Sequence, residues 1–277
     1  MSGCRHDALM FGGNAVRVGV LSRPDQPVDL GVVVVVGGRQ YRAGAHRQFV
    51  SLSRSIARAG CACLRFDVGG MGDSPGPRQS FEALDDDIAS AIEALRNACP
   101  GVSRVVLWGL CDGATAALLF SRRRSDVPLA GLSLVNPWLH SAQAQATARV
   151  GHYYPRRLRD PAFWRKLISG KVDLSAALRG WYQARKASSR SARDHAVTFV
   201  DLACAALRES MLPIQVVLAD ADLTAQEFMA AVDDCARGSL SRANFRIDHV
   251  ADADHTFSTS AWQTALERAV IDWLRRL

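Results

Sequence analysis

The sequence predicts a protein of the α/β class, in which a mostly parallel sheet is flanked by helices. Strand-like and helix-like segments alternate along most of the 277 residues, which is typical of a parallel sheet covered by helices. Residues 31–36 form a nearly continuous valine run, as expected for a strand buried on both faces. Hydrophobic residues make up 48% of the chain, so one sizeable core can form.

Each element is expected from its own pattern. Residues 15–22 alternate between apolar and polar positions and predict an early antiparallel strand. A helix over about 46–59 should end at Gly60, which provides a glycine C-cap. Further strands are expected at residues 61–67, 104–109, 129–136, 214–220 and 245–250, and further helices at 80–98, 112–122, 195–209, 224–236 and 260–277.

The alternation stops between residues 137 and 193, where the sequence is aromatic, basic and helical. This stretch indicates an insertion into one domain, so residues 1–137 and 194–277 are expected to form the core and residues 138–193 the insertion. The inserted segment carries 12 Lys and Arg against 2 Asp and Glu, a net charge of +10, whereas the rest of the chain has a net charge of −3. The basic character therefore belongs to the insertion.

Composition also bears on location and cofactors. The N-terminus has no apolar stretch behind a basic start, and the longest aliphatic run is five valines, far short of the roughly 20 residues of a membrane span. The seven cysteines are scattered, and no CxxC pair is present. We therefore expect a cytoplasmic protein with reduced thiols and with neither metal nor cofactor.

The strongest chemical signal is the run Gly109-Leu110-Cys111-Asp112-Gly113, between a predicted strand and an alanine-rich helix. It matches the G-x-S-x-G nucleophile elbow with cysteine in place of serine. Glycines on both sides allow the tight turn, and the following helix N-terminus favours a thiolate. The pattern predicts Cys111 as a nucleophile; a buried cysteine in an ordinary turn is the alternative.

An acid and a histidine should follow the nucleophile in that order. Asp222 follows the predicted strand 214–220, and His255 follows the strand 245–250, so both lie in strand-end loops. We expect His255 to act as the general base and Asp222 to orient its ring. Asp220 is the alternative acid, and His249 is the alternative base, although it falls within a strand.

The oxyanion hole should combine two backbone N–H groups. The first is that of Asp112, directly after the nucleophile. The second is expected in the loop 37–42, where Gly37 and Gly38 let the backbone approach a substrate. Arg39 is the preferred donor and Gly38 the alternative.

Taken together, these segments resemble the α/β-hydrolase superfamily over nearly the whole chain. The fragment FDVGGMGDSPG at residues 66–76 is similar to the superfamily's D-x-R-G-x-G-x-S stretch. The fragments VVGGRQYRAGAHRQF, LRFDVGGMGDS, VVLWGLCDG, DLTAQEF and ADHTFS resemble the hydrolases encoded alongside exosortase-type exopolysaccharide systems, which carry the same cysteine elbow. The resemblance implies an α/β-hydrolase fold and a triad of Cys111, His255 and Asp222. In this fold an insertion after the sixth strand usually forms a helical lid.

The cysteine favours acyl transfer, because exchange between a thiol and a thioester is nearly isoenergetic. A thioesterase or acyltransferase acting on carrier-bound acyl thioesters is therefore the preferred function. The alternatives are a carboxylester hydrolase acting on acylated polysaccharide or small esters, and a non-catalytic binding protein, which the complete Cys–Asp–His order disfavours.

The basic insertion favours an anionic partner. Candidates are an acyl carrier protein, a coenzyme A thioester or an anionic glycolipid; a solvated helical face is the alternative, and no nucleic-acid-binding motif accompanies the charge. The residues expected to contact the substrate or partner are Trp138, Arg156, Arg157 and Arg159.

Overall fold

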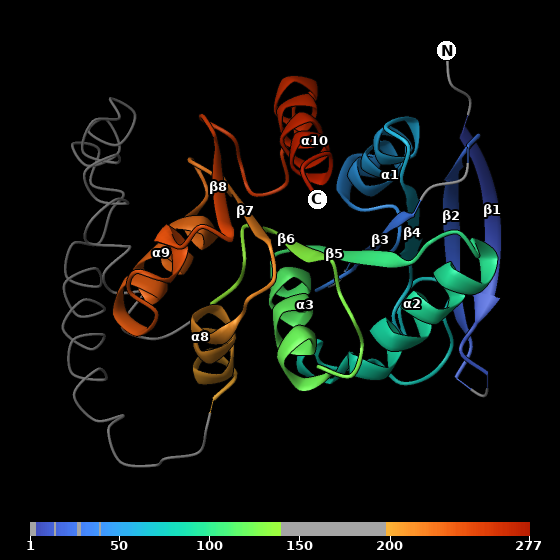
Figure 1. Cartoon of the computed structure of the whole chain (residues 1–277), viewed down its shortest axis with the longest axis horizontal. Coiled ribbons are helices and arrows are strands. Elements are labelled where there is room, and N and C mark those ends of the chain that lie inside the picture. The colour runs from blue at the N-terminus through green and yellow to red at the C-terminus, as the bar shows by residue number, and fades with distance from the viewer. Residues whose placement is uncertain (1–3, 14, 27–28, 39, 140–197) are drawn as a thin grey trace, which may run out of the picture.

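The computed structural model describes residues 4–13, 15–26, 29–38, 40–139 and 198–277. Its strands form one eight-stranded sheet in the order β1-β2-β4-β3-β5-β6-β7-β8 (Figure 1). The pairs β1–β2 and β2–β4 are antiparallel and the other pairs are parallel, which confirms the predicted class. The strands are β1 (Cys4–Phe11), β2 (Arg17–Pro24), β3 (Leu30–Val35), β4 (Ala62–Phe66), β5 (Arg104–Leu110), β6 (Gly131–Val135), β7 (Ile214–Ala219) and β8 (Phe245–Val250).

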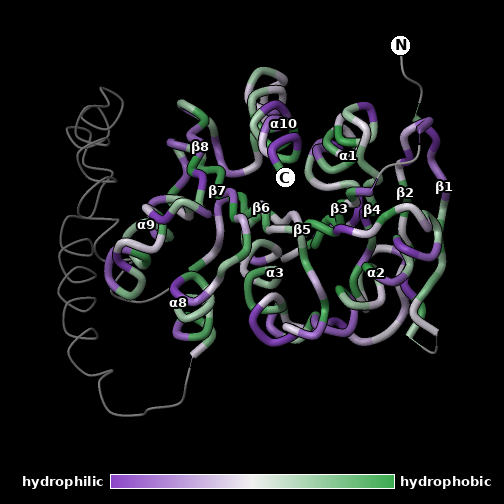
Figure 2. Tube along the Cα trace, in the orientation of Figure 1, coloured by the Kyte–Doolittle hydropathy of each residue, from purple (hydrophilic) through white to green (hydrophobic). Residues whose placement is uncertain are grey.

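Helices cover both faces of this sheet (Figure 1). Helices α1 and α10 pack against one face, and α2, α3, α8 and α9 pack against the other. The described helical segments are η1 (Ala45–Arg47), α1 (Gln48–Arg58), η2 (Phe81–Ala83), α2 (Asp85–Ala98), α3 (Asp112–Arg123), α8 (Phe199–Glu209), α9 (Leu223–Cys235), η4 (Ser239–Ser241) and α10 (Ser260–Leu274). Figure 2 shows hydrophobic residues concentrated in the central strands, between the two helix layers.

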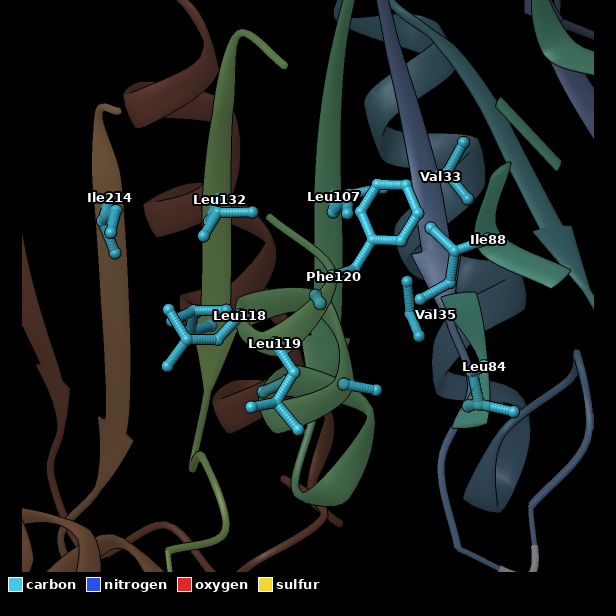
Figure 3. Close-up of a cluster of buried hydrophobic side chains, with 14 of the residues drawn as sticks. Val33, Val35, Leu84, Ile88, Leu107, Leu118, Leu119, Phe120, Leu132 and Ile214 are labelled. Carbon is cyan, nitrogen blue, oxygen red and sulfur yellow. The ribbon is translucent and has the colours of Figure 1, made fainter. Parts of the chain in front are cut away.

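The valine run of β3 is explained by these two layers. Side chains along a strand alternate between its faces. Val33 and Val35 accordingly join the cluster formed with α2 and α3, which Figure 3 shows beside Ile88 and Phe120, while Val32 and Val34 join the cluster formed with α1 and α10. A strand covered on both sides has no position that favours a polar residue, so the run is continuous.

The first strand was not expected from the sequence. β1 (Cys4–Phe11) pairs with β2 at the edge of the sheet, and all of its side chains are either half-buried or exposed. Such a strand carries polar residues and therefore lacks the continuous apolar signal of the central strands. Residues 140–197 lie outside the described residues, so the insertion at 138–193 stays a prediction. Among the residues that the structure does describe, no helix is long and apolar enough to cross a membrane.

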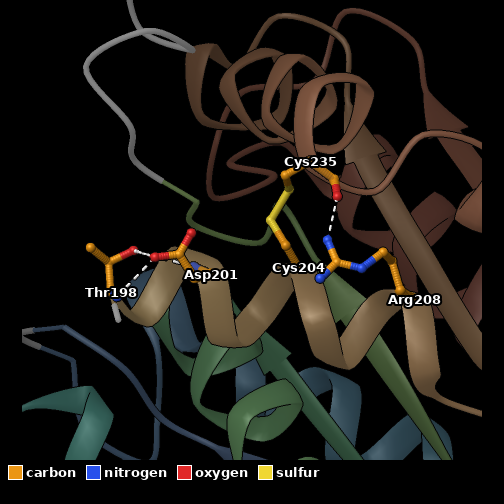
Figure 4. The surroundings of a disulfide bond; sticks show 5 residues. All are labelled: Thr198, Asp201, Cys204, Arg208 and Cys235. Atoms are coloured by element: carbon orange, nitrogen blue, oxygen red, sulfur yellow. Dashed lines mark hydrogen bonds between the residues drawn. A yellow bond between two sulfur atoms is a disulfide. The ribbon is translucent and has the colours of Figure 1, made fainter. Parts of the chain in front are cut away.

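The expectation that all thiols are reduced is wrong for one pair of cysteines. Cys204 of α8 and Cys235 at the end of α9 form a disulfide (Figure 4). Beside it, Arg208 Nη1 donates a hydrogen bond to the Cys235 carbonyl oxygen at 2.5 Å. The two cysteines are separated by 31 residues, and a spacing of this kind does not indicate pairing without the fold. The disulfide ties together two helices on the same face of the sheet.

Reducing this disulfide should lower the free energy of unfolding, because it closes a 31-residue separation in the unfolded chain. For such a loop the loss is roughly 3–4 kcal/mol. Urea unfolding of the Cys204→Ser/Cys235→Ser variant measures it, and Cys99→Ser, which replaces a free half-buried thiol, serves as the control. Equal midpoints for the wild type with and without reductant would contradict the expectation.

Candidate active site

Cys111 lies on the turn between β5 and α3, in a backbone conformation that is rare for a residue with a side chain (φ 60°, ψ −125°). The flanking glycines are required by close packing. A Cβ at Gly109 would lie 2.5 Å from the Ala114 nitrogen, and one at Gly113 would lie 2.5 Å from the Val35 carbonyl oxygen. The local sequence therefore fixes a sharp strand-to-helix turn, as the elbow pattern predicts.

Hydrogen bonds of its own backbone N–H and carbonyl hold Cys111 in this strained conformation. The Cys111 N–H donates to the Val135 carbonyl at 2.9 Å, and the Cys111 carbonyl accepts from the Trp138 N–H at 3.2 Å. Thr115 Oγ1 in turn donates to the Trp138 carbonyl at 2.7 Å. The end of β6 thus stabilises the elbow, which is how a surrounding structure maintains an unfavourable conformation.

Asp222 and His255 meet in the loops after β7 and β8. The Nδ1 atom of His255 lies 2.6 Å from Asp222 Oδ2. The other carboxylate oxygen, Oδ1, accepts the Thr224 N–H at 3.1 Å, so that Asp222 is the N-cap of α9. Asp222 is only 7% exposed. Both carboxylate oxygens are thereby hydrogen-bonded, Oδ1 to the first turn of α9 and Oδ2 to the imidazole ring of His255.

The Cys111 side chain lies close enough to the His255 ring to affect its titration. Burial alone would lower the pKa of His255, but interactions with Asp222 and Cys111 outweigh it and raise the pKa to about 10. At neutral pH the imidazole is therefore protonated, and its positive charge lies beside the Cys111 side chain. The structure brings all three residues of the predicted triad together.

The two alternative residues contact each other. His249 Nδ1 lies 2.9 Å from Asp220 Oδ1, and both side chains are exposed, at 58% and 45%. His249 lies within β8, as expected. The geometry therefore separates the two candidate pairs, and it favours Asp222 as the acid that contacts His255.

Sequence reasoning missed two residues that hold the histidine loop. Asn136, which is fully buried directly after β6, accepts the Ala219 N–H at 2.8 Å and donates to the His255 carbonyl at 3.2 Å. Asp254 accepts hydrogen bonds from the backbone N–H groups of Thr256 and Ser258. A polar residue at the end of a buried strand was the available signal for Asn136. Among the described residues, no cluster of His, Cys, Asp or Glu could hold a metal ion.

The glycine loop after β3 lies against the elbow. A Cβ at Gly37 would come within 2.3 Å of the Gly113 nitrogen, so glycine permits this approach. The loop is anchored by buried Asp67, whose carboxylate accepts the Arg42 N–H at 2.6 Å and pairs with the Arg42 guanidinium. The preferred oxyanion donor, Arg39, lies outside the described residues. The N–H groups of Asp112 and Gly38 both lie at the elbow.

Trp138 belongs to an aromatic cluster next to the elbow. Its ring stacks on Phe199 at a centroid distance of 5.3 Å, and the Phe81 ring meets it edge-on at 5.5 Å. All three side chains are half-buried. Of the four residues expected to bind substrate or partner, Arg156, Arg157 and Arg159 lie outside the described residues, so their role stays a prediction.

Comparison with known proteins gives the family and the fold. A family model described as serine aminopeptidase, S33, matches residues 29–223, a span that includes Cys111 and Asp222 and ends before His255. A search of curated proteins gave no significant match.

Several solved structures are similar to this one. A dienelactone hydrolase from Anabaena variabilis is 15% identical with a TM-score of 0.62, covering 99% of this chain and 98% of its own. An esterase from Pyrococcus furiosus is 13% identical with a TM-score of 0.64, covering 99% and 93%. A thermophilic esterase from Thermogutta terrifontis is 18% identical with a TM-score of 0.57, covering 98% of each chain. These likenesses confirm the predicted α/β-hydrolase fold.

The protonated His255 makes the reactivity of Cys111 testable. Because the imidazole keeps its proton below about pH 10, a positive charge lies beside the Cys111 side chain and favours its attack on iodoacetamide. At neutral pH Cys111 should therefore be alkylated about tenfold faster in the wild type than in His255→Ala. Peptide mass spectrometry resolves the sites. Because burial raises the pKa of the Cys61, Cys63 and Cys99 thiols, these should react more slowly. Equal Cys111 alkylation rates in the wild type and in His255→Ala would contradict this effect of His255.

Proposed function

We propose, from the premise that this chain belongs to the α/β-hydrolase family described as serine aminopeptidase, S33, that it transfers acyl groups through an acyl-cysteine at Cys111. The family and the fold make it a hydrolase of the α/β type. The preferred activity within that class is a thioesterase or acyltransferase acting on carrier-bound acyl thioesters. The fragments that resemble exosortase-associated hydrolases favour membership of that group.

One observation carries the proposal: His255 lies between a carboxylate and a thiol. Its Nδ1 atom is 2.6 Å from Asp222 Oδ2, and the Cys111 side chain lies close enough to the ring to help raise its pKa. A base that contacts a nucleophile and is oriented by a third group is the arrangement of covalent acyl transfer. The cysteine lies on an elbow whose helix N-terminus supplies backbone N–H donors.

Acylation follows from this arrangement. The Cys111 sulfur attacks the carbonyl carbon, a C–S bond forms, and the carbonyl electron pair moves onto oxygen, where the N–H groups at the elbow stabilise the charge. When the carbonyl re-forms, the bond to the leaving sulfur or oxygen breaks. The leaving group takes the proton that His255 holds in the resting state.

Deacylation reverses the proton flow. His255, now neutral, removes a proton from water or from an acceptor alcohol, amine or thiol as that group attacks the acyl-cysteine. The new tetrahedral centre collapses and releases Cys111 as a thiolate beside the imidazolium. Asp222 stabilises the charged ring in both half-reactions, because its carboxylate stays on Nδ1.

The aromatic cluster supports an acyl substrate with an apolar body. Trp138 is joined to the elbow through its backbone, and its ring stacks on Phe199 beside Phe81. Half-buried aromatic rings next to a nucleophile provide apolar contact area for an acyl chain. Thioester exchange favours cysteine as the acyl carrier, whereas the ester that serine forms is more stable.

Carboxylester hydrolysis, on acylated polysaccharide or small esters, is the second candidate. It is favoured by the solved structures described as esterases from Pyrococcus furiosus and Thermogutta terrifontis. The two candidates differ in substrate. Both forms of the first candidate should consume an acyl thioester faster than the matching oxygen ester, with an added nucleophile acylated by an acyltransferase and free acid released by a thioesterase. A carboxylester hydrolase should prefer the oxygen ester and release free acid, and intact-protein mass spectrometry detects the acyl-cysteine.

The triad variants should differ in a graded way. Cys111→Ala should abolish turnover, and His255→Ala should lower kcat by roughly three orders of magnitude or more. Asp222→Asn should cost less, because the carboxylate orients the ring without carrying the proton. Asp220→Asn is the matched control and should change kcat by less than about twofold. If Asp220→Asn were the more damaging substitution, the assignment of the acid would be wrong.

The basic insertion should bind an acidic thioester carrier. Because exposed charges act on encounter rate and are screened by salt, raising the ionic strength should lower kcat/KM for a carrier-bound thioester much more than for a small neutral one. Reversal of Arg156, Arg157 and Arg159 to Glu should have the same effect at low salt. The control reverses Arg237, Arg268 and Arg276 to Glu, because these arginines are exposed and lie outside the insertion. Equal salt sensitivity for both substrates would contradict the docking of an acidic carrier on the insertion.

A further inference from the structure

The side chain of Asp112, the residue after the nucleophile, lies on the glycine loop and not in solvent. Its carboxylate lies near the backbone N–H groups of Gly38, Gly113 and Asp112 itself, and these groups favour its ionised form. The contact is close: a Cβ added at Gly37 would lie 2.0 Å from Asp112 Oδ1, and one added at Gly38 would lie 3.6 Å from each carboxylate oxygen. Asp112 is half-buried.

Two of these three groups are candidate donors for the substrate oxygen. An oxyanion hole at an elbow uses the N–H of the residue after the nucleophile and an N–H of the loop after the third strand. The first is the N–H of Asp112; for the second, Gly38 is the alternative to Arg39, which lies outside the described residues. The N–H groups of Asp112 and Gly38 both lie close enough to the Asp112 carboxylate to favour its anion. A carboxylate oxygen carries the charge and the acceptor geometry of a tetrahedral oxyanion, so it fits the same donors.

We propose that the Asp112 carboxylate is a resident occupant of the oxyanion hole, which the carbonyl oxygen of a substrate must displace before Cys111 is acylated. This inference rests on the proposed function of Cys111. It assigns the Asp112 side chain a role separate from that of its backbone N–H, namely to decide which substrates can enter.

The occupant is held, but it can be displaced. Arg78, from the loop between β4 and η2, contacts the glycine loop, with Nη2 donating to the Gly38 carbonyl at 3.1 Å. It favours the anion, as does the N-terminus of α3. Burial nevertheless raises the pKa of the Asp112 carboxyl, although the three N–H groups and Arg78 act in the opposite direction. The anion is therefore less stable here than in water, and an outward rotation of the side chain would restore its hydration.

Displacement makes the site selective. A small ester offers little contact besides its carbonyl, so it must compete with the carboxylate for the donors unaided. A larger acyl group also contacts the aromatic cluster of Trp138, Phe81 and Phe199, and that binding energy can be used to empty the hole. While the carboxylate occupies the hole, only the remaining fraction of the enzyme can bind a substrate oxygen there. The acylation rate for small substrates is therefore lowered in proportion to that remaining fraction.

Two reactions at the same sulfur separate this role from thiol reactivity. Acylation of Cys111 by p-nitrophenyl acetate forms an oxyanion, whereas alkylation by iodoacetamide displaces iodide from a saturated carbon and forms none. In Asp112→Ala the acylation burst should be about tenfold faster than in wild type, while alkylation should stay within about twofold. Asp126→Asn, an exposed carboxylate beyond the far end of α3, is the control and should change neither rate.

Asp112→Asn is the second variant, because it keeps the size of the side chain if the alanine variant does not fold. Its neutral amide is a weaker competitor, so acylation should again accelerate, by a smaller factor. Unchanged or slower acylation in the folded variants, with a wild-type alkylation rate, would overturn the role given to the Asp112 carboxylate and leave the proposed function of Cys111 intact. If Cys111 takes up no acyl group in the wild type or in either variant, the proposed function fails and this inference fails with it.

Discussion

The candidate active site depends on two parallel strands that end at the same level of the sheet. β7 and β8 pair over six residues, up to Ala219 opposite Val250. The loops that follow therefore start side by side, and Asp222 and His255 meet at 2.6 Å. Asn136 adds the end of β6 to this arrangement, because its amide contacts both the Ala219 N–H and the His255 carbonyl. Asp222 and His255 are thus held by the same hydrogen-bonded layer of strand ends, and a shift of any one strand would move both.

Sequence patterns predicted the parts of the molecule that a periodicity or a local motif encodes. The central strands were predictable because both faces are covered, as the valines of β3 show, and the elbow was predictable because its glycines meet neighbouring backbone. The edge strand β1 was not, since its exposed face accepts polar residues. The pairing of Cys204 with Cys235 depends on how α8 and α9 pack, and no spacing rule contains that information.

The choice between the two acids shows the same limit at the level of single residues. Asp220 and Asp222 lie two positions apart after one strand, and sequence order allows either of them to face the histidine. The fold separates them by the start of α9, whose first turn engages Asp222 through the Thr224 N–H. Asp220 is left with the exposed His249. Helix capping, a local interaction, therefore contributes to placing Asp222 rather than Asp220 beside His255.

A cysteine at this elbow changes when the proton moves. With serine, the base takes the proton as the hydroxyl attacks. Here the contacts with Asp222 and Cys111 raise the pKa of His255 to about 10 against the effect of burial, so the proton is on the ring before a substrate arrives. The elbow also holds the Asp112 carboxylate near a helix N-terminus with few N–H donors. In the proposed reaction, a substrate carbonyl adds another centre of negative charge as it is attacked. Because the donors cannot serve the carboxylate and that oxyanion at once, the proposed acylation of Cys111 is coupled to the ionisation of Asp112 through the same backbone groups.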